Sequence, residues 1–461
     1  MNKEIKYLII FTIVILALIT RLFLLNIRPL HHDEGVNYFF ADNILEGRGF
    51  KYDPLNYHGP SYFFILFASF LILGISEFSL RLPAAFFGII LVCLPLFLKF
   101  KEKSTKYLTA AFLLLSPSIM YYSRYSIHEI LFVLSSFLAI YYLTSIINNK
   151  QIDHLPLLSA SLAILLTTKE TSIIILFILF IIFILNFKEI KKIDLRDKES
   201  IFWSIAIFLI IYITLFTSFF TNSHGIIDSF RGYFPWTERV FTEPGHIKPF
   251  SYYLTLLLQY ELPLLFLSFI GIWYAFKNQK DIFARNIAVW LILSFFIYSF
   301  ISYKTPWLIV NISVPMSIMA AIGVKQIKNI KIKSCLVILT LIYLSVFSFY
   351  LNFSRPWQSD NSFAYVHTEA DILNLVKELN ENYKPNEKIL VVSDTYWPLP
   401  FYLNGKKVEY LDQAENLTYK SDYNYDIVKE DIFSKSNLPS DYKFSKYSLR
   451  EGENLYLVHR K

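Results

Sequence analysis

Long apolar runs recur along this chain of 461 residues, and they constrain its fold more than any other feature. The first run, Tyr7 to Leu25, is long for a signal peptide, and no cleavage site of small residues follows it. We therefore expect it to remain as a membrane span. With 54% apolar residues, the chain cannot be a single soluble core with a polar covering. The sequence predicts an all-α polytopic membrane protein.

We predict about eleven membrane spans from the apolar runs. They lie near residues 7–25, 83–98, 106–122, 128–147, 155–168, 171–187, 201–220, 254–276, 286–303, 306–323 and 334–351. One further run, Tyr62 to Ile75, has a length that suits a re-entrant or interfacial helix better than a full span.

Basic residues in the short loops predict the orientation, because Lys and Arg there stay on the cytoplasmic side. If the run Tyr62–Ile75 does not cross and the N-terminus is cytoplasmic, every strongly basic loop is cytoplasmic; if it crosses, all of them face outward. These loops contain Lys99, Lys101, Lys103, Lys106, Lys188, Lys191, Lys192, Arg196, Lys198, Lys325, Lys328, Lys331 and Lys333. We therefore predict a multi-pass protein of the cytoplasmic membrane with a cytoplasmic N-terminus.

In the same topology, four segments rich in polar and charged residues lie on the outer side of the membrane. "HHDEG" at 31–35 with the loop after it, "YYSRYSIHE" at 121–129, the loop Thr221–Phe250 and "YKTPW" at 303–307 all face outward. ATP and nucleotide sugars are on the opposite side, so an enzyme here needs substrates delivered through or outside the bilayer. The net charge of +7 follows membrane orientation, and a nucleic-acid partner is not expected.

The chain changes character after the last span. Residues 1–351 form the predicted transmembrane domain, with its first outer loop at 26–82, and residues 352–461 form a small extracytoplasmic α/β domain. Thr368 and Asp371 stand at capping-box spacing and predict a helix start at Thr368. The segments "KILVVS" and "NLYLVH" predict short strands.

The stretch "HHDEG" places two acids at the start of a predicted amphipathic helix that lies at the interface. The helix dipole favours ionised Asp33 and Glu34 there, which suits a base or a metal ligand. Adjacent residues on a helix point about 100° apart, so the two acids should have different roles. The alternative is that Asp33 only caps the helix.

Further charged and imidazole side chains come from the other outer segments. Each has a simpler explanation, such as an arginine that reaches for lipid headgroups or a turn between two spans, but outer loops normally carry fewer cations. The residues are His58, Arg81, Arg124, His128, Glu129, Lys169, Glu170 and Lys304. Glu261 lies inside an apolar run and either lines a cavity or marks a helix break before Pro263.

These groups suit sugar transfer from a lipid phosphate. A carboxylate can deprotonate the acceptor hydroxyl, and cations or a bound metal can stabilise the leaving phosphate. The aromatic surroundings suit sugar stacking, although Tyr and Trp also form ordinary interfacial belts.

At these residues the chain resembles the GT-C superfamily of polyprenyl-phosphate-dependent glycosyltransferases, which includes protein mannosyltransferases and lipid A aminoarabinose transferases. The resemblance lies in "HHDEG", "EFSLRLPAA", "YYSRYSIHE" and "TTKETS", over roughly the first 190 residues. "YHGPSYF", "YKTPW", "YVHTEADI" and "YWPLPFYL" look more narrowly like the archaeal and bacterial family described as flippase-associated in N-glycosylation. The resemblance implies the GT-C fold in a surrounding of membrane lipids. It also implies a sugar transfer from a polyprenyl-phosphate donor to a glycan, lipid or protein acceptor, with inversion at the anomeric carbon.

The resemblance also implies roles for single residues. Asp33 and Glu34 match the catalytic acidic motif, with Asp33 as general base, while His32, His58 and Glu129 would position the acceptor or a metal. His58-Gly59-Pro60 stands where the aminoarabinose group often has Lys-Pro-Pro, so His58 replaces a phosphate-binding lysine or binds metal. Among the cations of the outer segments, we expect Arg81, Arg124, Lys169 and Lys304 to bind the lipid phosphate.

Two questions stay open at this stage. A divalent metal ion is a possible cofactor, with Glu34, His58 and Glu129 as candidate ligands, since some GT-C enzymes need one and others do not. The alternative function is a non-catalytic partner in translocation of a lipid-linked oligosaccharide, which needs phosphate-binding cations but no aligned base.

Overall fold

The computed structural model describes residues 3–55, 58–100, 104–242, 246–412 and 422–460. The chain divides into two compact units. We call the first, Met1–Leu25 with Asn43–Ser354, the membrane unit, and the second, Asn26–Asp42 with Arg355–Lys461, the C-terminal unit. Tyr57, Lys101 and Lys103 of the predicted motifs and basic loops lie outside the described residues.

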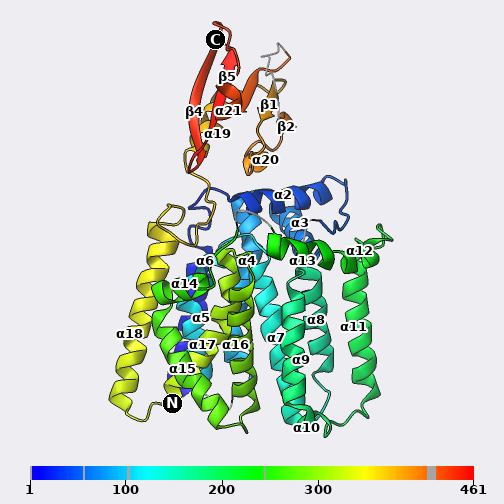
Figure 1. Ribbon diagram of the computed structural model, residues 1–461, viewed down its shortest axis with the longest axis vertical. Helices are drawn as coiled ribbons and strands as arrows, with labels where there is room; N and C mark the ends of the chain where they lie inside the picture. The colour runs from blue at the N-terminus through cyan, green and yellow to red at the C-terminus, as the bar shows by residue number, and fades with distance from the viewer. Residues whose placement is uncertain (1–2, 56–57, 101–103, 243–245, 413–421, 461) are drawn as a thin grey trace. The chain divides into compact units, whose positions relative to one another are not determined.

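The membrane unit is a bundle of helices, most of which run side by side, with α10 and α13 at opposite ends (Figure 1). Its helices are α1 (Lys3–Leu22), α3 (Ser61–Leu73), α4 (Glu77–Phe97), α5 (Thr105–Leu115), α6 (Pro117–Tyr122), α7 (Glu129–Asn149), α8 (Leu155–Thr168), α9 (Ser172–Leu185), α10 (Phe187–Ile190), α11 (Lys198–Phe216), α12 (Gly225–Arg231), α13 (Tyr233–Thr242), α14 (Tyr252–Tyr260), α15 (Leu262–Lys277), α16 (Ile282–Phe300), η1 (Pro306–Ile309), α17 (Val310–Gln326), α18 (Ile330–Phe349) and η2 (Tyr350–Ser354).

Among the described residues, 7 helices are long and apolar enough to cross a membrane, or up to 8 if the bent pair α14 and α15 is one span. The predicted spans at 106–122, 155–168 and 171–187 contain the shorter apolar helices α5, α8 and α9. The ambiguous run Tyr62–Ile75 lies mostly in α3, which has 13 residues and is one of the shorter apolar helices. The polytopic helical fold expected from the sequence is therefore confirmed.

Burial separates the inner helices from the lipid-facing ones. The apolar window of η1 and α17 is 94% buried and that of α7 is 78% buried, whereas α11 is only 11% buried. Outer helices keep large apolar side chains such as Phe202 and Ile210 exposed, because lipid is as apolar as the protein interior. The sequence pattern alone does not distinguish these positions.

Two glycines allow the inner helices α15 and α17 to approach closely. A Cβ on Gly271 would lie 2.1 Å from the carbonyl oxygen of Met319, and a Cβ on Gly323 would lie 2.1 Å from that of Leu267. Small residues at such contacts replace the missing hydrophobic drive between helices in lipid with close van der Waals packing.

The C-terminal unit contains a sheet flanked by helices. Its elements are α2 (His32–Leu45, which belongs to this unit as far as Asp42), α19 (Ile372–Asn382), β1 (Lys388–Val392), α20 (Leu399–Tyr402), β2 (Lys407–Leu411), β3 (Tyr425–Lys429), α21 (Glu430–Phe433), β4 (Tyr442–Arg450) and β5 (Glu453–Arg460). The strand order is β2-β1-β3-β5-β4, with β2, β1 and β3 parallel and the last two strands antiparallel to their neighbours.

The predicted strands and the helix are present, with one correction. "KILVVS" contains β1 and "NLYLVH" lies in β5. The predicted helix start at Thr368 is wrong, because α19 begins at Ile372. One oxygen of Asp371 accepts the backbone N–H of Ser448 in β4 at 2.8 Å, so a tertiary contact uses the carboxylate that the capping-box pattern reserved for the helix.

The unit boundary also differs from the predicted one. The C-terminal segment separates after Ser354 rather than after residue 351, and it takes Asn26–Asp42 with it. The acidic motif of the first loop therefore belongs to the same compact unit as the C-terminal segment.

Candidate functional site

The first turn of α2 is capped by its own motif. The backbone N–H of His31 donates to Oε2 of Glu34 at 3.1 Å, and the backbone N–H of Asp33 donates to Nδ1 of His31 at 3.1 Å. This is the reciprocal pattern of a capping box, with an imidazole in the place of the usual hydroxyl. Glu34 is fully buried and satisfies the helix end.

Asp33 has different surroundings, as the helix geometry predicts. Its carboxylate is half-buried, and among the described residues no side chain or backbone group donates a hydrogen bond to it. His31 and Glu34 supply the helix cap, so Asp33 does not serve as one. Of the two acids, Asp33 has the carboxylate available to take a proton.

The residues before Asp33 are held by distant parts of the chain. The backbone N–H of Leu30 donates to the hydroxyl of Tyr402 at 2.8 Å, and Nε2 of His31 donates to the carbonyl of Tyr365 at 2.7 Å. Burial, with a smaller effect of the Arg450 charge, lowers the pKa of His31 to about 3. His31 is therefore neutral, which leaves its Nδ1 free to accept the helix N–H.

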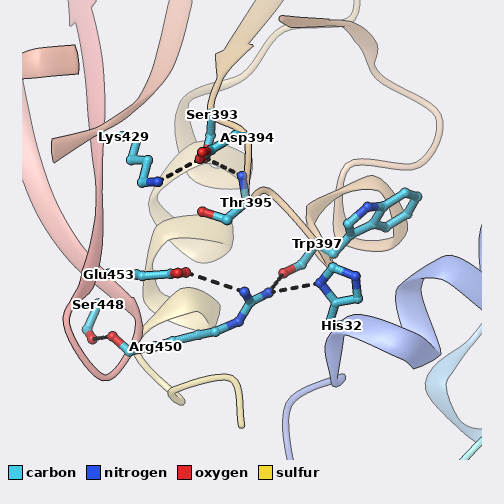
Figure 2. A network of polar contacts seen from close by, with 9 residues as sticks. All are labelled: His32, Ser393, Asp394, Thr395, Trp397, Lys429, Ser448, Arg450 and Glu453. Atoms are coloured by element: carbon cyan, nitrogen blue, oxygen red, sulfur yellow. Dashed lines mark hydrogen bonds and ion pairs between the residues drawn. The ribbon is translucent and has the colours of Figure 1, made fainter. Parts of the chain in front are cut away.

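His32 contacts the other end of the chain (Figure 2). Nη2 of Arg450 donates to Nδ1 of His32 at 3.4 Å and to the carbonyl of Trp397 at 2.6 Å, while its Nη1 lies 3.3 Å from Glu453. The rings of His32 and Trp397 meet edge to face, with centroids 6.2 Å apart. Burial, partly opposed by the Asp33 carboxylate, lowers the pKa of His32 to about 4.

Gly35 lets the helix reach the segment after β1. A Cβ at this position would lie 2.9 Å from both Cα and Cβ of Pro398, and 3.2 Å from the ring of Trp397. Farther along α2, Tyr38 packs edge to face against Phe401 at 5.1 Å. The motif "YWPLPFYL" thus supplies the contacts that hold "HHDEG", a role that sequence reasoning did not assign.

In the membrane unit, three predicted site residues come together. His58 pairs with Lys169 as an isolated β-bridge, and the N–H of Gly59 donates to the carbonyl of Thr168 at 3.0 Å. A Cβ on Gly59 would lie 2.2 Å from the carbonyl oxygen of Thr167, so glycine is required in "YHGP". Nζ of Lys169 forms an ion pair with Glu129. The motifs "YHGPSYF", "SIHE" and "TTKETS" therefore meet at one place.

His128 was named among the outer groups in the sequence, but no role was assigned to it. Its ring lies against His58 with centroids 4.6 Å apart and against Tyr62 at 4.8 Å. It is 1% exposed, and its Nε2 has no hydrogen-bond partner among the described residues. Burial, together with His58 and Lys169, lowers its pKa well below the usual range. Its position directly before Glu129 was the signal for including it.

Glu170 is the second charged residue in the same turn. The hydroxyl of Tyr52 donates to its Oε1 at 2.5 Å. Burial raises the pKa of Glu170 to about 7, against the opposing effect of that hydrogen bond. The bond fixes the turn between α8 and α9 to the segment before α3.

Lys304 lies between two chain segments near the start of η1. Its Nζ donates to the carbonyls of Lys248 at 3.0 Å and Ile301 at 2.5 Å. An ammonium group has three protons, so these two bonds leave one for a ligand. Desolvation lowers the pKa of Lys304, and no described carboxylate forms an ion pair with it.

The arginines predicted to bind phosphate instead meet the end of α1. Arg124 donates to the carbonyls of Thr20, Phe23 and Leu24 at 2.9, 2.8 and 2.7 Å. Arg81 donates to the carbonyl of Leu25 at 3.0 Å. Carbonyls at and just after a helix C-terminus lack partners within the helix and attract cations. The phosphate-binding role of the two arginines stays a prediction.

Glu261 marks a helix break, which decides between the two alternatives of the sequence. The chain bends by 108° between the helices α14 and α15 at this residue. Its Oε1 accepts from the hydroxyls of Ser116 and Ser118, both at 2.6 Å, and from the N–H of Ser118 at 3.2 Å. The fully buried acid thus satisfies the start of the short helix α6.

The candidate metal ligands do not fit a metal ion. No group of three His, Cys, Asp or Glu side chains among the described residues is arranged to hold one. Glu129 pairs with the cation of Lys169, and Glu34 accepts the N–H of His31. These two acids therefore already have positive or donor partners within the protein.

Comparisons with known proteins agree with this architecture. Residues 57–217 match the family described as dolichyl-phosphate-mannose-protein mannosyltransferase. The range contains His58, Glu129 and Lys169 but neither Asp33 nor Lys304. No curated protein matches the sequence.

Two solved structures share the fold over nearly the whole chain. ArnT from Cupriavidus metallidurans bound to undecaprenyl phosphate has a TM-score of 0.73 at 12% identity, covering 99% of this chain and 98% of that chain. The apo state of the same protein has a TM-score of 0.70 at 12% identity, covering 98% and 97%. At this identity the likeness shows the fold.

The helical bundle with its small sheet domain and the family match define the class of this protein. It is a membrane glycosyltransferase. More narrowly, the resemblance to the GT-C superfamily is confirmed.

Proposed function

We propose that this protein transfers a sugar from a polyprenyl-phosphate donor to an acceptor hydroxyl on the outer face of the cytoplasmic membrane, with inversion at the anomeric carbon. The observation that carries the proposal is the carboxylate of Asp33, which is held on the capped first turn of α2 and has no donor among the described residues. The lipid class is supported by the likeness to ArnT, a protein that was solved with undecaprenyl phosphate bound.

In this reaction Asp33 acts as general base. It accepts the proton of the acceptor hydroxyl while the hydroxyl oxygen attacks the anomeric carbon. The bond between that carbon and the phosphate oxygen breaks, and the phosphate leaves with the electron pair. Proton removal by Asp33 helps most when it occurs together with the attack of the hydroxyl oxygen on the anomeric carbon.

The leaving phosphate needs positive charge, and Lys304 is the residue best suited to supply it. Its two carbonyl contacts place the ammonium group without neutralising it, in contrast to Lys169, which pairs with Glu129. A preorganised, partly desolvated cation stabilises developing negative charge more than a solvated one does. Lys169 then serves to hold Glu129 in place beside His58.

The acceptor is a glycan, a lipid or a protein that presents a hydroxyl on the outer face. That orientation is supported by the basic loops, which follow the rule that Lys and Arg stay cytoplasmic.

A transfer assay with radiolabelled polyprenyl-phosphate sugars tests the proposal. The full chain in native-lipid nanodiscs is incubated with each labelled donor and a membrane extract, and the labelled product is identified. Wild type should label a product, while Asp33→Asn should abolish transfer and still bind undecaprenyl phosphate. Asp441→Asn, which changes an exposed carboxylate of the C-terminal unit, serves as the matched control and should keep full activity.

Near-normal transfer by Asp33→Asn would overturn the assignment of the base. Absence of transfer by wild type from every donor, with movement of a lipid-linked oligosaccharide across the membrane, would replace the enzyme with the translocation partner.

A further inference from the structure

Arg450 joins the far end of the chain to the acidic motif. It lies at the end of β4, is 7% exposed, and is separated from His32 by 418 residues. Its contacts reach one residue on each of three segments, namely His32 at the start of α2, Trp397 after β1, and Glu453 at the start of β5 (Figure 2).

The chemistry of the guanidinium group fixes what these contacts do. Arginine is always a donor and its nitrogens lie in one plane, so Nδ1 of His32 must be the acceptor. A neutral imidazole then has its proton on Nε2. The bond from Nη2 to the Trp397 carbonyl, at 2.6 Å, is shorter than the bond from Nη2 to His32 and holds the guanidinium group in place.

Trp397 also contacts α2 directly, through its indole ring. Its ring meets the ring of His32 and also that of Phe39, with centroids 6.2 and 5.8 Å apart. His32 and Phe39 are seven positions apart, close to two helical turns, so one indole spans the same face of α2 on which His32 lies. Arg450 and Trp397 together fix the rotation of this helix about its axis.

We propose that Arg450 is a positioning residue of the glycosyl-transfer reaction: through His32 and Trp397 it sets the rotation of the first turn of α2 and so the direction of the Asp33 carboxylate. The inference rests on the proposed role of Asp33 as base. It makes the C-terminal unit a part of the catalytic apparatus, because without Arg450 the unit can remain folded while the carboxylate loses its direction.

A merely structural role for Arg450 makes a different prediction. If Arg450 only stabilised the sheet, its loss would act on the whole C-terminal unit and leave turnover per folded molecule unchanged. If it positions Asp33, its loss acts on the α2 turn and on the chemical step. The rate then falls because a general base that is misdirected by about 1 Å can lose roughly a hundredfold in rate.

The test compares Arg450→Met with Arg460→Met in the full chain in nanodiscs. Arg460 lies on the neighbouring strand and forms an exposed ion pair with Asp441, so it is the matched control. Arg450→Met should lower kcat by about tenfold to a hundredfold. Its KM for the lipid donor should stay within about twofold of the wild-type value. Arg460→Met should change neither. Arg450→Lys keeps the positive charge and a single donor nitrogen but not the planar guanidinium group, so its kcat should fall between those of wild type and Arg450→Met.

Hydrogen exchange measured by mass spectrometry gives a readout that does not depend on activity. In Arg450→Met, peptides covering residues 26–42 should exchange faster, while those of β1, β3 and β5 should be unchanged. This part of the test stands even if Asp33→Asn keeps its activity, so failure of the base assignment and failure of the positioning role are distinguishable.

His32→Ala removes the same contact from the other partner and keeps the proposal testable if Arg450→Met does not fold. The double variant should be no worse than the more severe single variant, because both remove one coupling. Unchanged kcat in both single variants, or equal acceleration of exchange throughout the sheet, would overturn the positioning role.

Discussion

The backbone N–H of His31 donates to the Glu34 carboxylate at 3.1 Å, and this bond divides the work of the two acids in the motif. The Glu34 carboxylate accepts this N–H at the helix end, whereas the carboxylate of its neighbour Asp33 does not cap the helix. A capped start also fixes the direction in which the first turn presents its side chains. The same three residues therefore supply both the candidate base and part of its support.

The first prediction concerns these two acids. Glu34→Ala removes the cap and should lower the thermal stability of the protein by an amount equivalent to about 1 kcal/mol, with turnover reduced but measurable. Asp33→Ala should leave the melting temperature nearly unchanged and abolish transfer. Melting curves and transfer rates of the two purified variants check this, and the reverse pattern would exchange the two roles.

The second prediction concerns Lys304. Lys304→Ala should weaken binding of undecaprenyl phosphate by roughly tenfold or more and affect acceptor affinity much less. Because desolvation lowers its pKa, donor affinity of the wild type should also decline with rising pH before an ordinary lysine would lose its proton. Titration of the labelled lipid at several pH values measures both effects. Lys331→Ala, in the first turn of α18, is the control, and equal loss for donor and acceptor contradicts a phosphate role.

The third prediction concerns the ion pair between Lys169 and Glu129, which is almost fully buried. Lys169→Met leaves Glu129 without its counter-ion and should destabilise the protein by about 3 to 5 kcal/mol. The double variant Lys169→Met with Glu129→Gln should recover much of that loss, because no uncompensated charge remains. Thermal unfolding in the same detergent compares them; a double variant less stable than Lys169→Met would show that the pair does more than neutralise charge.

The fourth prediction concerns Asp426, a buried acid in the centre of the sheet. Its Oδ1 has no partner among the described residues, and burial raises its pKa to about 7. The folded state then binds the proton more tightly than the unfolded state, so stability falls as the pH rises from about 4 to about 7 and is constant above that range. The loss is on the order of a few kcal/mol.

Asp426→Asn removes this titration and should therefore be more stable than wild type at pH 7.5 but similar to it at pH 4.5. Melting temperatures of both proteins across that range provide the measurement. A difference that does not depend on pH would mean that the acid is not buried in its neutral form.

Much of the fold could be predicted because lipid imposes simple rules. Apolar runs predicted the helices, and the short segments "KILVVS" and "NLYLVH" predicted β1 and β5. The break at Glu261 was one of two alternatives, since an acid in an apolar run must find donors but the run does not say which. Only the structure names Ser116 and Ser118 as those donors.

The site was predicted less completely, for a physical reason. Sequence reasoning selected Asp33, Lys169, Lys304 and Arg124 by residue type. It could not show that Arg124 contacts the carbonyls at the end of α1, because a cation in a loop has the same appearance in the sequence whether it meets a ligand or a helix end. It did not select Arg450, which lies in a polar domain rich in similar residues.

By itself, the sequence determined that the chain is a helical membrane protein with acids and cations collected in a few loops, because burial of apolar surface and the cost of charge in lipid act on each segment separately. The tertiary structure decided which of those charged groups have their hydrogen bonds satisfied by the protein and which do not. That depends on contacts such as the one between His32 and Arg450, whose sequence separation of 418 residues leaves no local pattern to detect.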